Sequence, residues 1–142
     1  MKPRKLQIDF EFNFDLLGII SSARSYKLAW SINNALSLNL QSAEDIQLEL
    51  AGPRMVKIAN YLHKTENSHF RLIKNKPVDS FGKNNLPLLP ELGHLDYLFL
   101  VEGETYPITI RDIFQKLKVI NTIEYVVAIK VNELKSKENL LF

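Results

Sequence analysis

Asp96-Tyr97-Leu98-Phe99-Leu100-Val101 decides the fold, because every residue after the aspartate is apolar or aromatic. A nearly continuous apolar run of this length is typical of a strand covered on both faces, since a half-exposed strand alternates with polar residues. Glu102-Gly103-Glu104 ends the run. The sequence therefore predicts a strand over 96–101 in the interior of a layered domain.

Two segments on either side of this strand have helical periodicity. Ser22 is a plausible N-cap for a helix over about 22–37, in which Tyr26 and Trp30 share one face and are expected to anchor the core. Thr109 and Asp112 have the spacing of a capping box, which predicts the start of a second helix. The apolar positions are Tyr26, Ala29, Trp30 and Leu36 with Asn33 in the first stripe, and Ile110, Ile113, Phe114, Leu117 and Ile120 in the second.

Alternation with a period of two, or short apolar runs between turns, marks the other strands at 6–14, 46–50, 55–62, 70–75 and 123–131. The order strand-helix-strand-strand-strand-strand-helix-strand predicts one α+β domain over 1–142. We expect two layers, a mixed or antiparallel sheet of about six strands with two helices on one face. The strands 96–101 and 123–131 are either linked by a crossover or placed antiparallel. Residues 133–142 form a charged C-terminal tail with an apolar end.

Composition narrows the class of protein. A chain of 142 residues, 46% hydrophobic and 24% charged, is typical of one globular domain. The absence of cysteine excludes disulfides, thiolate metal sites and cysteine nucleophiles. No apolar run is long enough to span a membrane, and the first residues lack a signal core, so we expect a cytoplasmic protein without a membrane anchor.

The segment 76–94 contains three prolines, two glycines and two adjacent asparagines, and predicts a long loop. At its end, Glu91, His94 and Asp96 are the candidates for an acid–base set or a metal site, since two carboxylates and an imidazole suffice for such chemistry. The structural alternative is that Pro90 fixes the backbone, Glu91 binds loop amides and Asp96 opens the strand that Tyr97 begins to fill. Phosphate-binding loops and zinc-hydrolase motifs are missing from the sequence, so neither a cofactor nor a metal is predicted.

The stretch Leu89-Pro90-Glu91-Leu92-Gly93-His94-Leu95-Asp96-Tyr97 resembles the signature of the IPExxxVDY family, an uncharacterised bacterial family of Bacteroidetes type. Pro90, Glu91, Asp96 and Tyr97 match the signature, while Leu89 and Leu95 replace isoleucine and valine. The segments 15–19, 26–33 and 134–142 are also similar to the family. The resemblance implies no assigned activity, and it implies no role for His94, which falls at a variable position.

Charge is unevenly distributed along the chain. The net charge is +2, which is too small to indicate a nucleic-acid binder, but the segment 54–83 has seven basic and two acidic residues. Its candidate RNA-binding side chains are Lys57, Lys64, Arg71, Lys74 and Lys76. Regular alternation would place Arg71 and Lys74 on opposite faces of their strand, which argues against one continuous surface.

Three functions follow, in order of preference. The first is a non-enzymatic protein-interaction or adaptor protein that contacts its partner through the 76–97 loop and the terminal Leu140, Leu141 and Phe142. These three residues either pack back onto the domain or dock on the partner. The second is an RNA- or ribosome-associated accessory protein that uses the basic 54–83 segment. The third is a small-molecule enzyme centred on 89–97.

Overall fold

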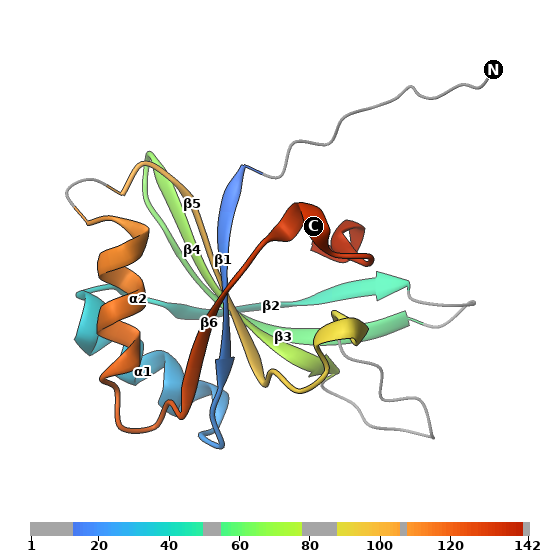
Figure 1. The fold of residues 1–142 in the computed structure, drawn as a ribbon, viewed down its shortest axis with the longest axis horizontal. Helices are drawn as coiled ribbons and strands as arrows, with labels where there is room; N and C mark the ends of the chain where they lie inside the picture. The colour runs from blue at the N-terminus through green and yellow to red at the C-terminus, as the bar shows by residue number, and fades with distance from the viewer. Residues whose placement is uncertain (1–12, 50–54, 78–87, 106–107, 141–142) are drawn as a thin grey trace.

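The computed structural model describes residues 13–49, 55–77, 88–105 and 108–140 (Figure 1). Its elements follow the predicted order, and the α+β class is confirmed. The strands are β1 (Phe14–Ile20), β2 (Gln41–Glu49), β3 (Met55–Lys64), β4 (Ser68–Pro77), β5 (Tyr97–Gly103) and β6 (Tyr125–Ile129). The helices are α1 (Ser25–Leu36) and α2 (Ile110–Lys118), and the short 3-10 turns are η1 (Pro90–Leu92), η2 (Val131–Glu133) and η3 (Lys137–Leu140).

All six strands form one antiparallel sheet in the order β2-β3-β4-β5-β1-β6. The apolar strand β5 lies between β4 and β1. Its residues 97–101 are buried on both faces of the sheet, as its composition predicts. Both β5 and β6 are antiparallel to β1, so they run in the same direction with β1 between them. The chain therefore crosses over from β5 to β6 through α2.

Both helices cover one face of the sheet, as predicted (Figure 1). The core beneath them includes Leu28 and Ile32 of α1, Leu117 of α2, and Leu17 and Phe99 of the sheet. The capping box that starts α2 is confirmed by two hydrogen bonds, from Thr109 N to Asp112 Oδ2 at 3.1 Å and from Asp112 N to Thr109 Oγ1 at 3.1 Å. These bonds lower the pKa of Asp112.

The details predicted for α1 are wrong. The helix begins at Ser25, its N-cap is Arg24 rather than Ser22, and no side chain caps it. Tyr26 is 63% exposed and Trp30 is 66% exposed, so neither anchors the core. The buried residues of the helix are Leu28, Ala29, Ile32 and Leu36. Because this aliphatic stripe already fills the space above the sheet, the two aromatic side chains lie on the opposite side of the helix.

The strand boundaries differ from the prediction at the N-terminal end. The strand predicted over 6–14 lies almost wholly outside the described residues, and β1 begins where it was expected to end. The apolar residues of β1 form a continuous run because its two faces contact different cores: Leu17 and Ile19 face the helices, and Leu16 faces away. Gly18 faces away as well, since a Cβ there would collide with the Leu95 side chain.

The second face of the sheet has a core without α-helices. Ile58, Ile73 and Leu98 of the sheet pack there against Leu89 and Leu140. The segments that cover this face are 88–95, which includes η1, and the C-terminal 131–140, and Figure 1 shows both on the side away from α1 and α2. Within the described ranges, no helix combines the length and the apolar content needed to cross a membrane.

Candidate functional site

Asn75, near the end of β4, holds the 88–95 segment against the sheet. Its side chain is fully buried, and its amide nitrogen donates to Leu92 O at 2.9 Å and to Leu95 O at 3.0 Å. Its Oδ1 accepts from Leu89 N at 3.0 Å, and its backbone carbonyl accepts from Leu88 N at 2.8 Å. Because buried backbone groups need partners, one asparagine allows an irregular segment to serve as a core layer.

Glu91 binds the C-terminal segment. Its carboxylate accepts hydrogen bonds from Ser136 N at 3.0 Å and from Ser136 Oγ at 2.6 Å. Burial acts to raise the pKa of Glu91, but the hydrogen bonds from Ser136 and the backbone outweigh it and leave the pKa lowered. The residue therefore acts as an ionised clamp between η1 and the chain that follows η2.

Asp96 and Tyr97 bind the connection between β1 and α1. Asp96 Oδ2 accepts from Ser21 N at 2.9 Å, and Tyr97 Oη donates to Ala23 O at 2.7 Å. Burial is the main cause that raises the pKa of Tyr97. Pro90 begins η1 and is exposed. Each of the other three residues that match the family signature thus contacts a distant part of the chain: Glu91, Asp96 and Tyr97.

The predicted acid–base candidates engage different partners. Glu91 binds Ser136, Asp96 binds Ser21, and His94 is exposed beside a shallow hollow of about 420 Å³ that Leu92 and Leu134 also line. In the part of the chain that the structure describes, no three His, Asp or Glu side chains are placed to hold a metal ion.

Leu140 packs into the fold rather than projecting from it. It is 4% exposed and belongs to the core of the second face. Nearby, Asn139 Nδ2 donates to Leu88 O at 2.8 Å, which fastens the C-terminal segment to the 88–95 segment. The tail was expected either to pack back onto the domain or to dock on a partner, and Leu140 packs onto the domain. Leu141 and Phe142 lie outside the described residues.

The predicted basic residues lie on both faces of the sheet. Phe70 and Leu72 face the helices and Ile73 faces away, so Arg71 and Lys74 lie on opposite faces. Arg71 Nη1 donates to Asn60 Oδ1 at 2.7 Å, and its burial lowers its pKa. Lys74 is half-buried, and the other three candidates, Lys57, Lys64 and Lys76, are exposed.

The outer face of α1 is a site that the sequence analysis did not identify. Tyr26 and the only tryptophan of the chain, Trp30, are four residues apart and therefore neighbours on this face. Burial raises the pKa of Tyr61 in β3, and Tyr26 raises it further. Lys27, three residues before Trp30, is exposed and is its neighbour on the helix, Arg24 is exposed at the N-cap, and the segment 22–37 contains no acidic residue. The sequence contains one signal for this exposure: the aliphatic stripe on the other side of the helix is complete without Tyr26 and Trp30. Its residues are Leu28, Ala29, Ile32 and Leu36.

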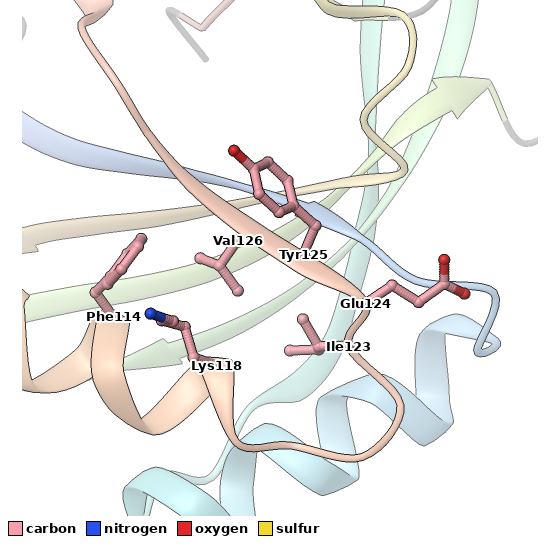
Figure 2. A pocket seen from close by; sticks show the side chains of 6 residues that line it. All are labelled: Phe114, Lys118, Ile123, Glu124, Tyr125 and Val126. Carbon is pink, nitrogen blue, oxygen red and sulfur yellow. The ribbon is translucent and has the colours of Figure 1, made fainter.

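A second hollow, of about 280 Å³, lies between α2 and the edge strand β6. Figure 2 shows Phe114 and Lys118 extending from α2, with Ile123 and Glu124 in the segment just before β6. Tyr125 projects from the strand on the side away from Ile123. The Lys118 amine lies 5.5 Å from the centre of the Phe114 ring.

No family model matches this chain, and neither the curated proteins nor the solved structures include one that is significantly similar to it.

Proposed function

We propose that this chain is a non-enzymatic adaptor of the cytoplasm, which binds another protein through the outer face of α1. The observation that carries the proposal is the exposure of Tyr26 and Trp30, each more than 60% accessible on one side of a single helix. We also propose that the chain belongs to the IPExxxVDY family, whose signature the 89–97 segment resembles.

Exposed tryptophan and tyrosine favour a protein partner. These two residue types dominate the binding energy of protein interfaces, because each combines a large apolar surface with one polar atom. Burying an exposed aromatic side chain of this kind contributes roughly 1.5–3 kcal/mol. Since Leu28 and Ile32 already anchor the helix, Tyr26 and Trp30 are available to a partner without any change in the fold.

The charges beside the aromatic pair favour an acidic partner. Lys27 lies three residues before Trp30 and is its neighbour on the helix surface, Arg24 is exposed at the N-cap, and no carboxylate in the segment 22–37 opposes them. Complementary charge steers association and selects among partners with similar apolar surfaces. We therefore expect an apolar groove or helix face with acidic residues at its rim.

Purification of the tagged chain from its native cells tests this proposal. Wild type, the double variant Tyr26→Ala/Trp30→Ala and the control Val119→Ala are compared after ribonuclease treatment. Val119 is 78% exposed at the end of α2, so this control removes exposed apolar surface, though less of it, from another face of the molecule. We expect one acidic protein to remain with wild type and the control and to be lost from the double variant.

Two outcomes would overturn the proposal. Retention of the partner by the double variant would remove α1 as the interface. Release of all bound material by ribonuclease, with loss of binding in Lys74→Glu/Lys76→Glu, would favour an RNA-associated function through β4 instead.

A further inference from the structure

The two edges of the sheet differ in how they are protected. Edge strands usually have charged residues, proline or bulges that prevent pairing with another chain. The edge strand β2 has exposed Glu44 and Asp45, and its register with β3 shifts between Ala43 and Ile46. The sequence of β6 is Tyr-Val-Val-Ala-Ile, with no charge or proline, and its register with β1 is unbroken.

Side chains of β6 are also accessible on both faces of the sheet. Tyr125 is 55% exposed, Ala128 is exposed, and Val127 and Ile129 are half-buried. In Figure 1, β6 runs at the edge between α2 on one side and the C-terminal segment on the other. Among the strands that the structure describes, only β1 pairs with β6. An apolar strand with one unpaired edge is a template for another strand.

We propose that β6 pairs antiparallel with β6 of a second copy, so that two sheets join into one across a two-fold axis at Val127. Charge complementarity selects both the occupant and the register. When Val127 lies opposite its own copy, Glu124 of each chain lies opposite Lys130 of the other. The five apolar residues then oppose one another, with Tyr125 opposite Ile129 and Val126 opposite Ala128.

Other registers lose this match. A shift by two residues places Glu124 opposite Ala128 or Asn132, and a shift by one residue places it opposite Ile129 or Val131. Glu124 and Lys130 are both exposed in the single chain, so pairing them across the edge requires no rearrangement of the core. Opposite charges directly across an antiparallel pair stabilise it, and like charges destabilise it.

The pairing also fills the hollow beside β6. Val126 and Glu124 line this hollow (Figure 2). In the proposed register they lie opposite Ala128 and Lys130 of the second copy. On the other face, Tyr125 gains Ile129 of the second copy as a cross-strand neighbour. An interface built on five residues of strand is small, so we expect a dimer that forms reversibly with concentration.

Sedimentation equilibrium of the purified full chain is the first test, with exposed Glu66→Lys and Lys64→Glu of the β3–β4 turn as matched controls. We expect Glu124→Lys and Lys130→Glu each to weaken dimerisation by about tenfold, because each sets like charges across the edge twice. The double variant Glu124→Lys/Lys130→Glu should recover wild-type dimerisation. A chain that stays monomeric at all concentrations, or a dimer that the single reversals leave unchanged, would overturn the proposal.

Disulfide formation tests the register separately, since the chain has no cysteine of its own. Opposed residues of an antiparallel pair have Cα atoms about 4.5–5.5 Å apart, which a disulfide bridges. Oxidised Val127→Cys should therefore cross-link into dimers, whereas Tyr125→Cys should not, because its own copy lies about 13 Å away along the strands. Cross-linking of Tyr125→Cys in place of Val127→Cys would contradict this register. The result is independent of α1, so it leaves the proposed adaptor function to its own test.

Discussion

Asn75 supports the second face of the sheet through buried hydrogen bonds rather than through apolar packing. Its side chain is the partner of the buried groups Leu89 N and Leu95 O, and it also donates to Leu92 O, which accepts from Leu95 N as well. Leaving a buried donor or acceptor without a partner costs about 1–3 kcal/mol for each group.

We therefore expect Asn75→Ala to lower the free energy of unfolding by about 2–5 kcal/mol, since two buried backbone groups, Leu89 N and Leu95 O, lose their partner together. Urea unfolding measures the change, with Asn34→Ala as the control at an exposed position of α1. A loss below about 1 kcal/mol would show that Asn75 does not hold the segment.

Glu91 should make stability depend on pH. Its pKa in the folded chain is lowered, against about 4.3 in the unfolded chain. The stabilisation is therefore present above the unfolded pKa and is lost as the pH falls through the folded pKa. Between about pH 6 and about pH 3, wild type should lose more stability than Glu91→Gln, which cannot titrate. The same comparison with Glu104→Gln is the control, and identical pH profiles for wild type and Glu91→Gln would refute the clamp.

Local residue roles were predictable from the sequence, and distant ones were not. The Thr109–Asp112 capping box is correct because both partners lie within one turn of helix. Asp96 and Ser21 are 75 positions apart, and Glu91 and Ser136 are 45 apart. No local spacing records such a pair, so the sequence left open whether these carboxylates serve folding or chemistry.

At the scale of elements, α1 shows why periodicity alone misplaced a helix face. Its apolar residues occur on both sides, so a stripe through Tyr26 and Trp30 and a stripe through Leu28 and Ile32 both fit a period of 3.6 residues. The second stripe is the more completely aliphatic of the two, and packing against the sheet selects it.

Trp30→Ala should therefore leave the free energy of unfolding within about 0.5 kcal/mol of wild type, as at other exposed sites. Ile32→Ala on the buried side should lower it by about 2–5 kcal/mol. Thermal and urea unfolding of the two variants side by side provide the measurement. A large loss in Trp30→Ala would mean that the side chain is part of the core, which would also remove it as a binding anchor.

The C-terminal segment 131–140 also contributes buried side chains to the core, on the second face of the sheet. Leu140→Ala should cost about 2–4 kcal/mol, because the side chain is buried among Leu88, Leu89 and Val131. Glu138→Ala, an exposed change two residues earlier, is the matched control for urea unfolding. If Leu140→Ala were as stable as the control, the segment would be free to leave the domain and dock on a partner.

At the scale of the whole molecule, the class of fold follows from element order, and the arrangement does not. The alternation of strands and helices predicts α+β with helices on one face, and the apolar run 97–101 predicts an interior strand. The placement of β1 between β5 and β6, which leaves β6 at the edge, depends on pairings between residues at least 78 positions apart, such as Ile19 and Tyr97. The sequence also did not predict that the segments 88–95 and 131–140 cover the second face, because neither segment is a regular α-helix with a recognisable apolar stripe.

Photo-cross-linking inside native cells tests the adaptor function most directly. A benzophenone amino acid replaces Trp30, and a control replaces the exposed Lys64 at the far end of β3. We predict a covalent adduct with one protein that forms at position 30, survives ribonuclease and is missing at position 64. Equal labelling at both positions, or an adduct only with RNA, would contradict the account.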